Sequence, residues 1–116
     1  MARFNYNDKV FVGVENYHDG DMTGETRFHY FQRGDVVWGI FDGGNVAKGT
    51  LVARVLEDDR LAMIWQYLNN DGQFFSGSCT AVPELLPDGR YRLHESWQVT
   101  GRDGQTGTSV IEEVRG

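Results

Sequence analysis

The chain has 116 residues and a mass of 13.2 kDa, which predicts a single domain spanning residues 1–116. Seventeen acidic residues against eleven basic ones give a net charge of −6. This balance argues against a nucleic-acid partner and against an anionic membrane surface. No apolar run approaches the roughly 20 residues needed to span a bilayer. The polar start from Met1 to Lys9 and the lone Cys79 indicate a cytoplasmic protein without an internal disulfide.

Fifteen glycines, 13% aromatic residues and the lack of apolar residues at helical spacing favour an all-β chain. Short apolar or alternating segments are separated by turn residues, as in the Asp-Gly-Gly-Asn turn at 42–45. The predicted strands are Lys9–Val14, Thr23–Gln32, Asp35–Phe41, Val46–Leu56, Arg60–Leu68, Gln73–Ala81, Arg90–Thr100 and Gln105–Val114.

The short connections predict antiparallel neighbours, because a parallel crossover needs a dozen or more residues. Eight such strands form a meander, and closing it into an up-and-down barrel removes both exposed edges. Glycines inside the strands, at 39, 49, 77 and 107, would ease the coiling that closure requires. The same glycines are also compatible with bulges in an open sheet or a sandwich, which is the alternative fold.

Glu95 is the main anomaly of the pattern. It shares a face of the strand with Tyr91, Leu93, Trp97 and Val99, so it is expected on the apolar side. A buried carboxylate must be paired, hydrogen-bonded or neutralised. Three interpretations remain open: a satisfied structural Glu, a carboxylate that lines a cavity as ligand anchor or general base with a raised pKa, and a bulge that turns the side chain outward.

A cavity inside the barrel would be lined by Tyr30, Trp65, Tyr67, Glu95 and Trp97, which we take as the candidate ligand-binding residues. An eight-stranded barrel can hold one small ligand or be filled by its own side chains. The segment 46–56 supports an open lumen, because the predicted inner face is small (Ala47, Gly49, Leu51, Ala53 and Val55). The alternative is that the aromatic rings simply fill the core.

Two of the predicted strands are apolar on both faces, over the stretches Val36–Phe41 and Leu61–Leu68. Their outer faces need a cover, either the loop segment Pro83–Pro87 or a second subunit. We expect a homodimer with these strands in the interface, because exposed apolar patches usually mark contacts.

Motifs for metals and nucleophiles are weak. The three histidines lie on different segments and there is one cysteine, so no metal site and no cofactor are expected. Cys79 has the features of a small buried residue more than those of a nucleophile. One of Glu112 and Glu113 should point inward on a regular strand, and the sequence leaves open which one.

The chain resembles a family of small bacterial proteins of about 110 residues that often carry the automatic label "N-acetylglutamate synthase". The resemblance rests on several short motifs: Phe28-x-Tyr30, Gly43-Gly44 with Lys48-Gly49, Gly77-x-Cys79, the Pro-rich stretch 83–90, residues 92–98, 107–109 and Glu112-Glu113. It implies no catalytic residue. The label itself does not fit the chemistry, because the sequence lacks the phosphate-binding loop and the basic cluster that acetyl-CoA would need.

The expected architecture is similar to that of the calycins, which include lipocalins, fatty-acid-binding proteins and avidin, although the lipocalin Gly-x-Trp signature is absent. Such a fold implies a module that binds a small apolar or amphipathic ligand, anchored here by Glu95. A second hypothesis is an enzyme without cofactor, of the isomerase, cyclase or hydratase type, with Glu95 as general base. A third is a structural or interaction barrel with a filled core.

Overall fold

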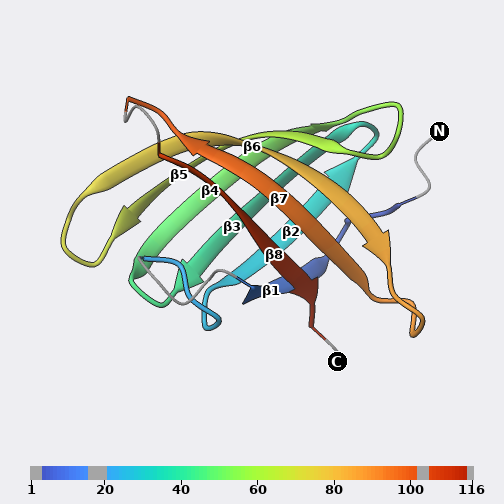
Figure 1. Ribbon diagram of the computed structural model, residues 1–116, viewed down its shortest axis with the longest axis horizontal. Helices are drawn as coiled ribbons and strands as arrows, with labels where there is room; N and C mark the ends of the chain where they lie inside the picture. The colour runs from blue at the N-terminus through green and yellow to red at the C-terminus, as the bar shows by residue number, and fades with distance from the viewer. Residues whose placement is uncertain (1–3, 16–20, 102–104, 115–116) are drawn as a thin grey trace.

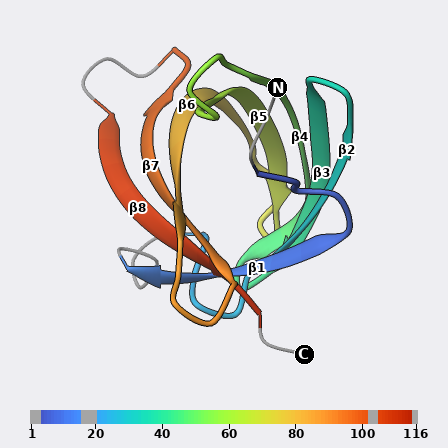
Figure 2. The same ribbon diagram turned by 90° about the vertical axis from the view of Figure 1, so that its right-hand side faces the viewer.

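The computed structural model describes residues 4–15, 21–101 and 105–114 and forms a closed antiparallel barrel (Figures 1 and 2). Its eight strands are β1 (Lys9–Glu15), β2 (Arg27–Arg33), β3 (Val36–Gly43), β4 (Val46–Val55), β5 (Leu61–Asn69), β6 (Phe74–Leu85), β7 (Tyr91–Val99) and β8 (Thr106–Glu113). Each strand pairs with the next, and β8 pairs with β1 to close the ring. This confirms the predicted all-β fold with up-and-down order and excludes the open sheet. No helix in the described residues is long and apolar enough to cross a membrane.

The inside of the barrel follows the predicted alternation along the strands. Leu93 and Glu95 of β7 are buried, whereas the alternating residues His94 and Ser96 are exposed. Phe28 and Tyr30 of β2 point inward in the same way. Ala47 is an exception, because a register shift between Val46 and Lys48 places it on the exposed side. The expectation that Ala47 faces the lumen is therefore wrong.

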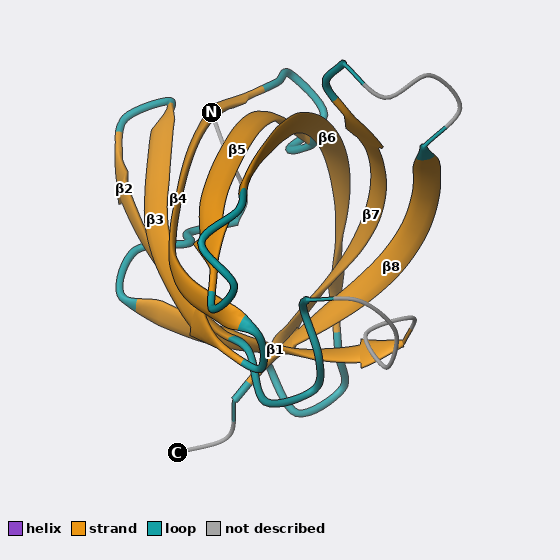
Figure 3. Cartoon of the chain, turned by 90° about the vertical axis from the view of Figure 1, so that its left-hand side faces the viewer, coloured by secondary structure: helices purple, strands orange, loops and turns teal. Residues whose placement is uncertain are grey.

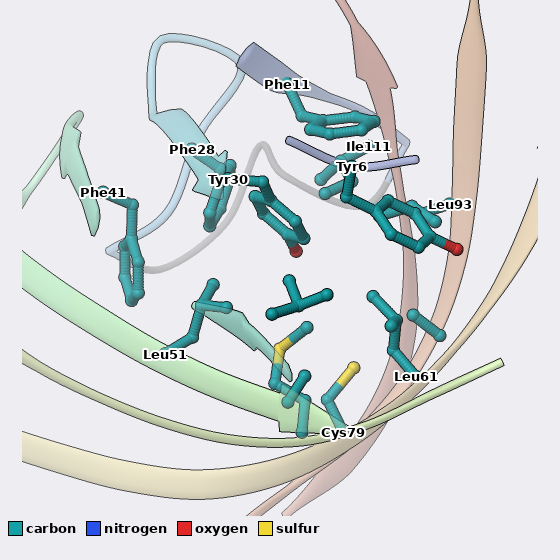
Figure 4. Packing of buried hydrophobic residues seen from close by; sticks show 14 of the residues in the cluster. Tyr6, Phe11, Phe28, Tyr30, Phe41, Leu51, Leu61, Cys79, Leu93 and Ile111 are labelled. Atoms are coloured by element: carbon teal, nitrogen blue, oxygen red, sulfur yellow. The ribbon is translucent and has the colours of Figure 1, made fainter. Parts of the chain in front are cut away.

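One end of the barrel is closed by the segment that precedes β1. The Tyr6 side chain is completely buried, and its hydroxyl donates a hydrogen bond to the carbonyl oxygen of Asp59, 3.1 Å away. Phe4 packs edge-on against Tyr91 at the same end. Figure 4 shows the Tyr6 ring beside a cluster of buried side chains that fills this half of the lumen: Phe11, Tyr30, Leu61, Leu93 and Ile111.

The opposite end is formed by the β3–β4 and β5–β6 connections together with the end of β7 and the start of β8, and Figure 3 looks into it. We call this end the mouth. The segment from Asp21 to Thr26, which leads into β2, lies here. The backbone N–H of Asn45 donates to the carbonyl oxygen of Asp21, 2.8 Å away, so this segment is tied to the β3–β4 turn.

The structure corrects the predicted loop after Ala81. β6 continues to Leu85, and Pro83 lies within it opposite Leu93 of β7. Pairing with β5 stops at Ala81, so residues 82–85 of β6 have a neighbouring strand on the β7 side only. Proline is tolerated at such an edge, because its missing N–H leaves no hydrogen bond unmade. Residues 83–85 are therefore part of the barrel wall, and Pro83–Pro87 is not a separate loop that could cover the outer faces of β3 and β5.

Those outer faces are apolar, as predicted. Trp38 of β3, Val52 of β4 and Ile64 of β5 lie directly opposite one another, with exposed fractions of 39%, 60% and 64%. The Phe31 ring of β2 stacks near Trp38 and lengthens the row. We call Phe31, Trp38, Val52 and Ile64 the outer apolar row.

Candidate functional site

The half of the lumen toward the mouth contains a cavity of about 380 Å³. This volume lies at the lower end of the range of about 300–1,000 Å³ found for small-molecule sites. All five predicted ligand-binding residues line it: Tyr30, Trp65, Tyr67, Glu95 and Trp97. The cavity shows that the rings do not fill the interior, which favours an open barrel over the filled one.

Glu95, Tyr30 and Cys79 form the floor of the cavity. Glu95 is 7% exposed, and it accepts a hydrogen bond of 2.9 Å from the Ser109 hydroxyl, which lies directly across on β8. The interpretation of an outward-turning bulge is therefore wrong. Cys79 of β6 and Tyr30 of β2 border the same space, and Figure 4 shows the Tyr30 hydroxyl and the Cys79 sulfur both pointing toward the barrel interior.

The Tyr30 hydroxyl is the unusual group of this floor. Its side chain is completely buried, and its oxygen has no hydrogen-bond partner in the structure. Burial, followed by repulsion from the Glu95 carboxylate, holds the pKa of Tyr30 well above its ordinary value, so the hydroxyl stays protonated. An unsatisfied buried hydroxyl costs about 1–3 kcal/mol. In native proteins such a group usually has a partner, either a protein atom, an ordered water or a bound molecule.

Cys79 is not suited to nucleophilic chemistry. Burial raises the pKa of its thiol strongly, and the nearby Glu95 carboxylate raises it further. The thiol therefore stays protonated at neutral pH. This agrees with the sequence-based interpretation of a small buried cysteine.

Aromatic rings form the walls because a glycine lies opposite each of them. Phe41 faces Gly49, Trp65 faces Gly77 and Trp97 faces Gly107 across neighbouring strands. A methyl group on any of the three glycines would lie 2.2–2.4 Å from ring carbon atoms. The rings can therefore lie flat over the bare backbone, and the space in the middle stays open.

The mouth carries a second carboxylate, that of Asp21. Its oxygens accept hydrogen bonds from the Tyr67 hydroxyl at 3.0 Å and from the Asn45 side-chain amide at 2.8 Å. The Asn69 amide adds longer contacts of 3.3 and 3.4 Å. Sequence reasoning missed Asp21 because it belongs to a polar loop, and only its position beside Tyr67 brings it to the cavity.

The indole N–H of Trp65, one of the wall residues, has a partner within the barrel, since it donates to the Ser78 carbonyl oxygen at 3.2 Å.

The orientation of the two C-terminal glutamates is now clear. Glu112 lies on the outer side, where its carboxylate binds Arg92 at 2.7 Å and Arg90 at 2.8 Å. Hydrogen bonds from Arg92 and then from Arg90 lower the pKa of Glu112. Glu113 lies at the closed end, 3.3 Å from Lys9, and takes no part in the cavity floor.

A closed eight-stranded barrel with an aromatic cavity around a buried carboxylate defines the class of small-ligand-binding barrels. More specifically, a family model described as "Avidin-like protein" matches residues 4–114, so the chain belongs to this avidin-like family. No curated protein and no solved structure matches the chain.

Proposed function

We propose that the protein binds a small, partly apolar ligand in the barrel lumen, with Glu95 as the polar anchor. The observation that carries this proposal is the cavity itself, where flat aromatic walls end at a floor with a buried carboxylate and an unsatisfied hydroxyl. A few polar groups at the end of an apolar cavity are the usual arrangement of a ligand site, since they set orientation and specificity.

Binding of a neutral apolar dye tests the proposal. N-phenylnaphthylamine should gain fluorescence with the wild-type protein, because its rings can stack between Trp65 and Trp97. Leu51→Trp, which adds a ring to the lumen, should reduce this gain, whereas Val52→Thr on the outer face should not. Unchanged dye fluorescence with the wild-type protein would refute the proposal. If the dye binds, native mass spectrometry of protein purified from cells can identify the natural ligand.

Acetyl-CoA is a useful negative probe for the same site. The cavity is lined by carboxylates from Asp21, Asp71 and Glu95. The phosphate groups of acetyl-CoA would be repelled by this negative charge. We therefore expect no heat of binding by calorimetry. A measurable heat would support the acetyltransferase label of similar chains.

A second candidate function is proton transfer by Glu95 on a bound substrate. The observation in its favour is that Glu95 and the Tyr30 hydroxyl, which stays protonated, border one cavity with largely aromatic walls. Glu95→Gln separates the two functions. It should change the affinity of a binding protein moderately, but it should abolish turnover in an enzyme.

We further propose that the outer apolar row is covered by a second copy of the chain, as the sequence predicts. The exposed fractions of Val52 and Ile64 support this, because both side chains extend from the outer wall of the barrel. Analytical ultracentrifugation should show a species of twice the mass of one chain, and Val52→Glu should convert it to a monomer. A wild-type species of only 13.2 kDa would contradict the proposal.

A further inference from the structure

Within the described part of the chain, the charged groups that line the cavity all have the same sign. Glu95 lies at the floor, and Asp21 and Asp71 lie at the mouth. Among the described residues, the lining contains no lysine, arginine or histidine. An anionic ligand would meet repulsion at both ends of this space, whereas a cationic ligand would be attracted at both ends.

The hydrogen-bonding groups of the floor point to a ligand that donates. An ionised Glu95 only accepts hydrogen bonds, and the Ser109 hydroxyl already donates to it. The Tyr30 oxygen has no partner and can accept as well. A protonated amine carries two or three N–H donors on one atom, so it can donate to both the Glu95 carboxylate and the Tyr30 oxygen.

The walls suit the same chemistry. Trp65, Tyr67 and Trp97 present aromatic surface around the cavity, and Trp65 and Tyr67 are stacked with ring centroids 5.9 Å apart. Aromatic faces attract cations and also pack against an apolar body.

We propose that the lumen binds an organic amine, whose ammonium group lies at the floor between Glu95 and the Tyr30 hydroxyl, with its apolar body between the Trp65 and Trp97 rings. This inference rests on the proposed binding function and specifies its ligand class. The ammonium group is attracted by the charge of the buried carboxylate and gives the Tyr30 hydroxyl a hydrogen-bond partner.

Three probes of nearly the same shape test the inference: phenethylamine, phenethyl alcohol and phenylacetate. Binding is followed by intrinsic tryptophan emission in a Trp38→Phe background, since Trp38 lies on the outer wall and the other two tryptophans line the cavity. The amine should bind about tenfold or more tightly than the alcohol, because its hydrogen bonds are charge-assisted. Phenylacetate should bind most weakly.

Variants assign the preference to the floor. Glu95→Gln should reduce the affinity for the amine to about that for the alcohol, and Tyr30→Phe should reduce it several-fold. Glu84→Gln is the matched control, because Glu84 is a half-exposed carboxylate on the outer side that pairs with His94. It should leave the preference unchanged.

The outcomes separate the inference from the proposed function. If the alcohol or phenylacetate binds as tightly as the amine, or if Glu95→Gln keeps the preference for the amine, the inference is wrong while lumen binding stands. If none of the three probes and no neutral dye binds, the proposed function fails together with the inference. The comparison of the three probes in the Trp38→Phe background needs no change at the floor, so it decides the matter even if Glu95→Gln does not fold.

Discussion

Gly107→Ala should push the Trp97 ring off the barrel wall and into the cavity. A methyl group on Gly107 would lie 2.4 Å from Trp97 Cζ2 and 2.7 Å from Cη2. Carbon atoms pack at about 3.5–4.0 Å, so the ring has to move by roughly 1 Å or more. The nearest obstacles are all atoms of the Trp97 ring, whereas a methyl group on Gly77 would also meet the backbone oxygen of Gln98 at 2.2 Å. Gly107 is therefore the cleaner position for the test.

The displacement has two measurable consequences. Overpacking of this kind costs about 1–3 kcal/mol, which lowers the melting temperature of a domain of this size by roughly 4–15 °C. The ring also takes up cavity volume, so binding of the neutral dye should weaken. Thermal unfolding followed by circular dichroism measures the first effect, and a fluorescence titration measures the second.

Two controls make the result specific. Gly24→Ala adds a methyl group whose nearest neighbour is a backbone oxygen at 3.4 Å, so it should change little. Trp97→Phe removes the two obstructing carbon atoms, so Gly107→Ala should cost less stability in that background. If Gly107→Ala melts and binds the dye like the wild type, the ring does not depend on the glycine and our account of the walls is wrong.

Three further predictions concern residues outside the walls. The Cys79 thiol should resist a thiol reagent at neutral pH and react only after unfolding, because burial raises its pKa; rapid reaction of the native protein would contradict this. Glu112→Gln should lower stability at neutral pH. Because the folded-state pKa of Glu112 is lowered, its contribution is present above its ordinary value of 4.5 and is lost as the pH falls below that value. Denaturant titrations at several pH values should show the two proteins converging in acid, and a constant difference would argue against the arginine contacts. Tyr6→Phe should destabilise the closed end by about 1 kcal/mol through loss of the hydrogen bond to Asp59, and an unchanged unfolding midpoint would show that this bond contributes nothing.

Much of the fold is predictable because side chains alternate along a strand. The pattern around Glu95 placed this carboxylate inside the barrel, and the same reasoning placed Trp97 and Tyr30 beside the lumen. The apolar outer faces of β3 and β5 were also visible, since neither strand alternates. Local pattern is sufficient for these features.

Features that depend on register or on loops were not predictable. The glycines at 49, 77 and 107 suggested coiling, but their position opposite Phe41, Trp65 and Trp97 follows only from the pairing of whole strands. Ala47 was misplaced because a register shift depends on the neighbouring strand. Asp21 reaches the mouth through contacts with residues more than 20 positions away, which no local pattern reveals.

The central claim is that a ligand occupies the mouth half of the lumen and meets Glu95 and Tyr30 at the floor. A high-resolution diffraction map of crystals soaked with phenethylamine tests it most directly. We predict density between the Trp65 and Trp97 rings, with a nitrogen within hydrogen-bond distance of both the Glu95 carboxylate and the Tyr30 hydroxyl. A lumen filled by the protein's own side chains, or a ligand bound only outside the barrel, would contradict the account.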